Sequence, residues 1–350
     1  MKAIDNLKRR QAAFQALDAK DKKTYWKEFA FNNALYFLII IAVIYTAIQN
    51  PRFVSTSSIV NIISLSAANI PIAVGIAGCI VLTGTDLSAG RMVGLSACLA
   101  GTLLQKADYS GKFFPNMPFY GVWWVAAVLL ICVAVCAIFG AINGIVVSYL
   151  QVPAFIGTLG MQLIVYGVCL VYTNATPIGG YRAAYTEVAK GQLFGFIPYL
   201  FLIALAVGIV MWFVYNKMPH GKYMYAIGGN EQAAEVSGVN TKKTKIIIYI
   251  TAAACYALGG FLVGAKSGGS SVNMGYGWEL EAIAACTIGG VSVNGGIGRI
   301  SGVLIGVLVF EILKTCLQYL GVDTNYQYIA QGIVIVVAIA LDIRKYIAKK

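Results

Sequence analysis

Residues 120–140 read YGVWWVAAVLLICVAVCAIFG and contain no charged side chain. The run matches the about 20 apolar residues that a helix needs to cross a ~30 Å hydrocarbon core, where only a helix satisfies its own backbone polar groups. Comparable apolar runs recur along the whole chain. We therefore predict ten membrane spans, at residues 33–49, 59–82, 88–106, 120–140, 154–173, 199–216, 245–265, 280–296, 300–320 and 326–342.

The composition agrees with a membrane protein. Hydrophobic residues make up 59% of the 350 residues and charged residues 11%, whereas soluble domains carry roughly 25% charged residues. This balance excludes a water-soluble fold and predicts an all-α, polytopic membrane helix bundle. All eight cysteines lie in apolar runs and His220 is the single histidine, so we expect buried packing cysteines and neither a metal site nor a catalytic centre.

The positive charges are concentrated in three stretches. Of the 26 Lys and Arg residues, 17 lie in residues 1–31, 217–245 and 343–350. This is the pattern of loops on the cytoplasmic side of a membrane, and it explains the net charge of +12 without a nucleic-acid partner. We expect a multi-pass protein of the inner (cytoplasmic) membrane, with both termini and the 217–245 loop in the cytoplasm.

The chain divides into three unequal parts. Residues 1–31 form a polar cytoplasmic segment whose Ile4, Leu7, Phe14 and Leu17 have helical spacing, so it is either a helix lying on membrane lipid or a frayed tail. Residues 32–345 form the transmembrane domain. Residues 346–350 form a short basic tail.

Two stretches share the pattern Gly-Arg-x-x-Gly and lie 208 residues apart. They are GTDLSAGRMVG at 84–94 and SVNGGIGRISG at 292–302. Gly-rich interruptions at corresponding positions of two halves are typical of broken helices beside a transport path, and they suggest pseudo-symmetric halves. The candidate path or gate residues are Asp86, Ser88, Arg91, Asn294 and Arg299. The alternative for the first stretch is that Asp86 caps a helix and Arg91 lies at the cytoplasmic interface.

Further charged residues approach or enter the predicted spans. Glu279 and Glu281 stand at the start of one span, and Glu311 and Lys314 stand three residues apart within another. Residues at this spacing lie on one face of a helix and can pair. We predict that Glu311 and Lys314 neutralise each other and that their role is structural rather than substrate binding.

The 217–245 loop contains a predicted short helix. Glu231–Gly238 follows Asn230, which is a favourable N-cap, and ends on a glycine, which is a favourable terminator. A short exposed helix of this kind suits docking into a groove of another protein. The alternative is an ordinary surface loop between two spans.

This loop also carries a family resemblance. Gln232-Ala233-Ala234 followed by Gly238 is similar to the Glu-Ala-Ala-x-x-x-Gly coupling motif of ATP-binding-cassette importers. Over residues 33–345 the chain resembles the permeases for ribose, xylose and galactose in that family, and Gly84–Arg91 is most like the galactose/methyl-galactoside type. The stretches that carry the likeness begin at Gly84 (GTDLSAGRMVG), Pro153 (PAFIGTLGMQLIVYG), Tyr225 (YAIGGNEQAAEVSGVN) and Glu279 (ELEAIAACTIGGVSVNGGIG).

The resemblance implies a transport subunit rather than an enzyme, translocating a monosaccharide. Its implied partners are a second copy of the chain, a periplasmic sugar-binding protein, and a cytoplasmic ATPase with two nucleotide-binding halves that holds ATP and Mg²⁺. This chain lacks a G-x-x-x-x-G-K-[ST] loop and is expected to bind no cofactor. The alternatives are a ribose- or xylose-type substrate, or a secondary sugar transporter without an ATPase. The implied coupling residues are Gly228, Gly229, Asn230, Glu231, Gln232, Ala233, Ala234 and Gly238.

Overall fold

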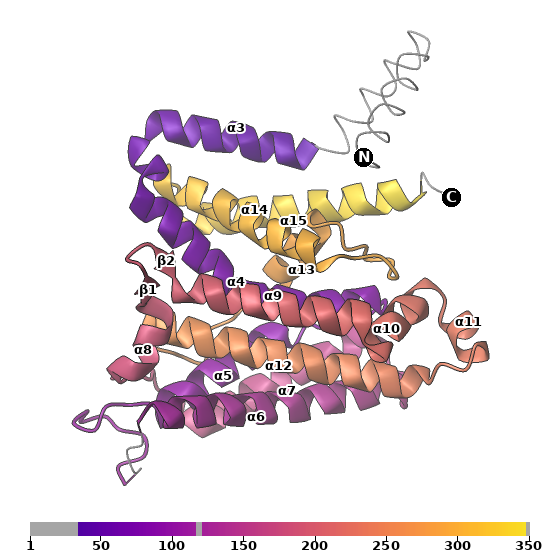
Figure 1. Ribbon diagram of the computed structural model, residues 1–350, viewed down its shortest axis with the longest axis horizontal. Helices are drawn as coiled ribbons and strands as arrows, with labels where there is room; N and C mark the ends of the chain where they lie inside the picture. The colour runs from indigo at the N-terminus through magenta and orange to yellow at the C-terminus, as the bar shows by residue number, and fades with distance from the viewer. Residues whose placement is uncertain (1–33, 117–120, 348–350) are drawn as a thin grey trace.

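The computed structural model describes residues 34–116 and 121–347. The segment predicted at 1–31 and residues 348–350 of the predicted tail lie outside this range. Most of the described chain is α-helical (Figure 1). Its elements are α3 Ala34–Gln49, η1 Pro51–Val54, α4 Thr56–Val81, α5 Ala89–Leu103, α6 Val122–Ser148, α7 Ala154–Thr173, α8 Ala183–Lys190, β1 Gln192–Leu193, β2 Ile197–Pro198, α9 Tyr199–Lys217, α10 Pro219–Gly229, α11 Glu231–Val236, α12 Thr241–Ser267, α13 Trp278–Ile288, α14 Ile300–Tyr319 and α15 Thr324–Ile347.

Seven of the described helices are long and apolar enough to cross a membrane. They are α4, α6, α7, α9, α12, α14 and α15, which confirms the all-α membrane bundle. The count of ten spans is not confirmed: α3, in the predicted span 33–49, has 16 residues, and the predicted full spans at 88–106 and 280–296 are short helices, α5 with 15 residues and α13 with 11. At 1.5 Å per residue α5 and α13 rise only about 22 Å and 16 Å, less than the ~30 Å of a hydrocarbon core.

Glycine and polar residues interrupt the apolar runs at these two places. α13 begins after Gly277 and is followed by Gly290, both in the left-handed region with φ of +79° and +82°. L side chains rarely adopt this conformation, so the helix breaks on both sides. α4, in contrast, continues through Pro71 to Val81.

The helices form an inverted repeat. α4 to α7 and α12 to α15 share the order long, short, long, long. The first helix of each half packs against the second and third helices of the other half: α12 contacts α5 and α6, and α4 contacts α13 and α14. Within each half the second helix contacts the fourth, α5 with α7 and α13 with α15. α4 ends where α12 begins, beside α10 and α11 (Figure 1). The halves are therefore pseudo-symmetric and antiparallel. The two Gly-Arg stretches do not correspond in this repeat, because one precedes the short α5 and the other the long α14.

Small residues bring the helix backbones together. A Cβ added at Gly140 or Gly144 of α6 would lie 2.6 Å from backbone atoms of α12, and one added at Gly260 of α12 would meet the carbonyl oxygen of Val93. Such close approach is typical of helix packing in membranes. Glycines thus let α12 approach α5 and α6 closely. The eight cysteines are buried, as expected, and are not bonded to one another.

The bundle has two distinct ends (Figure 1). α10 and α11 lie at one end, which we call the α11 end. α8 and the β1–β2 hairpin lie at the other, the α8 end. α5 finishes at the α8 end, because the Leu104 carbonyl accepts a hydrogen bond from the backbone N–H of Arg182, just before α8.

Candidate coupling surface and transport path

α11 is the short helix predicted at Glu231–Gly238. Asn230 caps it, since its Oδ1 accepts a hydrogen bond of 2.9 Å from the backbone N–H of Ala233. The helix ends at Val236, and Gly238 follows with φ of +85°. The backbone N–H of Val239 then donates to the Ala234 carbonyl at 3.1 Å. Local sequence signals alone therefore define both ends of α11.

The outer surface of α11 is open to a partner. Ala234 is buried against the bundle, whereas the Val236 side chain is 90% exposed. Glu231 and Lys245 form an ion pair of 2.6 Å that ties α11 to the start of α12. A polar groove runs beside the helix, lined by Ser148, Gln151, Asn230, Glu231, Gln232, Glu235, Thr241, Lys242 and Lys245. An exposed apolar side chain beside such a groove suits a protein contact.

Removal of the Asn230 cap should loosen α11 alone. We expect Asn230→Ala to cost about 1 kcal/mol of local stability, because the N–H of Ala233 loses its acceptor. Hydrogen exchange of the α11 amides in detergent would show this as faster exchange, with Asn230→Ser as the control that keeps an acceptor. Equal protection in Asn230→Ala and the parent chain would contradict the capping role.

α10 connects α11 to the end of α4. Gly228, the last residue but one of α10, packs so closely that an added Cβ would clash with the carbonyl oxygen of Val81 and the N–H of Gly296. The Gly296 N–H itself donates to Val81 at 2.9 Å, and the Tyr225 hydroxyl donates to the Gly298 carbonyl at 3.1 Å. Because α10 contacts both α4 and the 292–298 loop, a displacement of α11 would be transmitted through α10 to both. The sequence pattern missed α10, although Pro219 at its first position is a common helix start.

One predicted path residue, Asn294, lies in that loop, and a second, Arg299, follows it directly. Asn294 and Arg299 are both exposed at the α11 end. The loop is held by Asp342 of α15, whose carboxylate accepts from the Ser292 hydroxyl and the Val293 N–H, each at 3.2 Å. These two residues lie beside α10, separate from the buried surroundings of Asp86 and Arg91.

Asp86 and Ser88 lie together in a buried turn before α5. The Asp86 carboxylate accepts hydrogen bonds from the backbone N–H and the hydroxyl of Ser88. Ser88 Oγ accepts from Asn143 Nδ2 of α6 at 2.9 Å, and Thr158 Oγ1 of α7 accepts from the Leu87 N–H at 3.0 Å. This network holds the start of α5 between α6 and α7. Asp86 thus orders the turn before α5 but does not cap the helix, because α5 begins after Ser88 and has no side-chain cap.

Arg91 does not pair with Asp86. Its Nη1 donates to the Val272 carbonyl at 3.1 Å, and its guanidinium carbon lies 4.1 Å from the ring centre of Tyr166 and 4.9 Å from that of Tyr276. Arg91 also lies too far inside the bundle to be at a membrane interface, as the alternative interpretation expected. It lies twelve residues, or about 18 Å, before the end of α5 at the α8 end.

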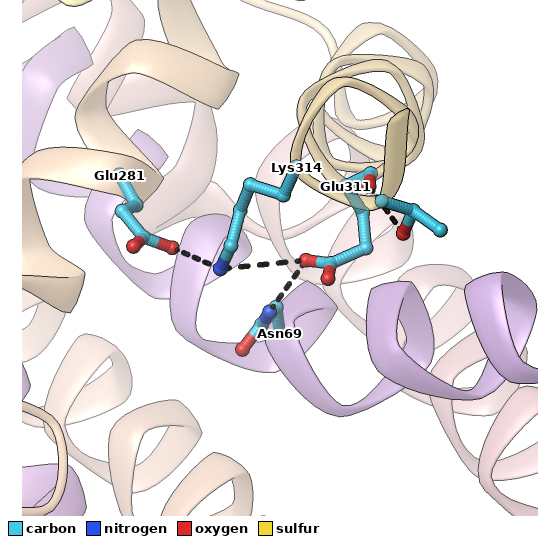
Figure 2. A network of polar contacts seen from close by, with 5 residues as sticks. Asn69, Glu281, Glu311 and Lys314 are labelled. Carbon is cyan, nitrogen blue, oxygen red and sulfur yellow. Dashed lines mark hydrogen bonds and ion pairs between the residues drawn. The ribbon is translucent and has the colours of Figure 1, made fainter. Parts of the chain in front are cut away.

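Lys314 bridges two carboxylates inside the bundle (Figure 2). Its Nζ lies 2.8 Å from Glu281 of α13 and 3.8 Å from Glu311 of α14, while Asn69 of α4 donates to Glu311 at 3.3 Å. The predicted Glu311–Lys314 pair is confirmed, and Glu281 joins it. Because three helices meet in this network, its geometry supports a structural role.

Comparison with known proteins places this arrangement in a family. A family model described as "Branched-chain amino acid transport system / permease component" matches residues 58–339. The chain belongs to this permease family. It is a transport component rather than an enzyme, and the importers of this kind generally work with an ATPase and a periplasmic binding protein.

The similar curated proteins are sugar permeases. The galactose/methyl galactoside import permease of Escherichia coli (strain K12) is 42% identical over 96% of this chain and 99% of its own length. The galactose/methyl galactoside import permease of Haemophilus influenzae is 39% identical over 91% of this chain and 96% of its own length. The ribose import permease of E. coli (strain K12) is 34% identical over 88% of this chain and 92% of its own length. No solved structure matches the chain.

Proposed function

We propose that this chain is the membrane subunit of an ATP-driven importer for galactose or methyl galactoside. It works as a homodimer in the inner membrane, with the α11 end and both termini in the cytoplasm. A cytoplasmic ATPase with two nucleotide-binding halves docks there and holds ATP and Mg²⁺, while this chain binds no cofactor. A periplasmic binding protein delivers the sugar at the α8 end. The higher identity to galactose than to ribose permeases supports the substrate.

The observation that carries this proposal is the position of α11. It is a capped helix with an exposed outer surface, and α10 connects it to the end of α4 through Gly228. A partner that pushed on α11 would act on rigid backbone contacts rather than on flexible side chains. Closure of the ATPase would thereby rock one half of the inverted repeat against the other and open the path alternately to each side.

A secondary sugar transporter is the second candidate, because Glu281, Glu311 and Lys314 form an ion network within the bundle. Charges at this depth often mark proton or ion paths. Here, however, Lys314 already binds both carboxylates in a contact between helices, and α11 would have no partner to dock with.

Gly238 offers a direct test of the coupling role. Nothing lies within 4 Å of a Cβ added at this residue, so a large side chain meets no part of the chain itself. We expect Gly238→Trp to leave membrane insertion intact and to lower galactose uptake about tenfold, because the indole blocks the docking surface and the bulky residue strains the φ of +85° after α11.

Gly238→Asn is the matched control, since Asn tolerates the positive φ of this position. Uptake should stay near that of the parent in this variant. If Gly238→Trp transported galactose as well as Gly238→Asn does, the assignment of α11 as the coupling helix would fail.

A further inference from the structure

The start of α5 and the segment 268–277 meet deep inside the membrane. Segment 268–277 follows α12, and its Ser270 pairs with Ile178 at the α8 end. It then turns inward, so that Gly275 packs against the Gly90 carbonyl. Gly90 lies thirteen residues, or about 20 Å, before the end of α5. Irregular backbone thus reaches the middle of the bilayer, which is tolerated only inside protein or along water.

A polar and aromatic cluster surrounds this meeting point. Arg91 lies over the rings of Tyr166 and Tyr276. The Tyr166 hydroxyl donates to Asn273 Oδ1 at 3.5 Å, and Gln162 Nε2 donates to Glu279 Oε1 at the same distance. The groups come from α5, α7, segment 268–277 and the first turn of α13.

One side of the cluster is open. The Tyr276 side chain is 68% exposed and Asn273 is also exposed. Polar side chains at this depth face a protein neighbour or a water-filled cavity, not lipid. We therefore expect the open side to face a second protein chain or water rather than lipid.

The other side of the cluster holds an unsatisfied buried group. Glu279 is 4% exposed, and its Oε2 has no hydrogen-bond partner among the described residues. This oxygen packs against Gly90, next to Arg91. The positive guanidinium and the negative carboxylate together leave the cluster close to neutral, which favours an uncharged ligand over an ion.

We propose that Arg91, Tyr166, Tyr276 and Glu279 form a contact site for a neutral monosaccharide in transit. The site rests on the proposed function, which supplies the sugar. The exposed Tyr276 ring offers an apolar face to the C–H groups of a sugar ring, and the amides of Asn273 and Gln162 lie beside it to meet hydroxyl groups. An aromatic wall with a few converging polar groups is the usual composition of small-molecule sites.

The test uses the reconstituted complex of this chain with its ATPase and binding protein in proteoliposomes. Two rates are measured in parallel: ATP hydrolysis stimulated by galactose-loaded binding protein, and uptake of radiolabelled galactose. We expect Tyr276→Ala to lower the galactose taken up per ATP about tenfold while stimulated hydrolysis persists. Tyr276→Phe, which keeps the ring, should restore most uptake.

Controls separate this site from a structural effect. Tyr45→Ala removes another exposed tyrosine, 53% exposed on α3, and should change neither rate. Glu279→Gln keeps the shape of the side chain and should alter the ratio of galactose to glucose uptake.

Two results would overturn the proposed site. One is unchanged uptake per ATP in Tyr276→Ala; the other is a parallel fall of hydrolysis and uptake, which would mean a packing role. Absence of stimulated hydrolysis in the parent complex would instead reject the proposed function itself.

Discussion

Replacing Gly228 with alanine should reduce transport by about tenfold or more. The added methyl group would overlap the carbonyl oxygen of Val81 and the N–H of Gly296. Both are backbone atoms, so no side chain can turn aside to relieve the clash, and α10 would have to move away from the end of α4. The connection from α11 to α4 would be lost. Galactose uptake in proteoliposomes measures this effect.

Gly229→Ala is the matched control for that change. Gly229 is the next residue in α10, it is exposed, and nothing lies within 4 Å of an added Cβ. Alanine is also the better helix former, so this variant should transport normally. Equal uptake by the two variants would show that contact of α10 with α4 does not matter for transport.

Replacing Lys314 with methionine should destabilise the folded protein by about 3–5 kcal/mol. The change leaves Glu281 and Glu311 facing each other without their shared cation, and Glu311 is buried. The thermal unfolding midpoint in detergent and the yield of monodisperse protein should both fall. Lys222→Met, which removes an exposed lysine of α10, should leave both unchanged.

A charge-neutral variant tests the reason for this effect. In the triple variant Glu281→Gln, Glu311→Gln and Lys314→Met, all three charges of this network are removed together, and stability should return close to that of the parent. A triple variant as unstable as Lys314→Met would point to loss of packing instead of unpaired charge. Full stability of Lys314→Met would contradict the structural role of the network.

The features that sequence predicted are those with local causes. An apolar run of sufficient length makes a span, and Asn230 with Gly238 defines α11 within eight residues. The Glu311–Lys314 pair follows from helix geometry. Each of these depends on residues that are close together along the chain.

The features that sequence missed depend on distant contacts. Residues 280–296 are apolar enough to resemble a span, but Gly289 and Gly290 end α13 and the remainder forms a loop. Arg91 meets Tyr166 and Tyr276, which lie 75 and 185 residues further along the chain. Pseudo-symmetric halves are predicted from the sequence, but the Gly-Arg pattern behind that prediction does not correspond between the halves, whose match depends on the packing of α4 and α12.

The most direct test is purification of the tagged chain from detergent-solubilised membranes. We expect an ATPase subunit to co-purify in stoichiometric amount and its ATP hydrolysis to rise when binding protein and galactose are added. Stimulation by ribose alone would retain the ATP-driven class and reject galactose as the substrate. Absence of any ATPase partner under mild detergent would contradict the proposed ATP-driven importer.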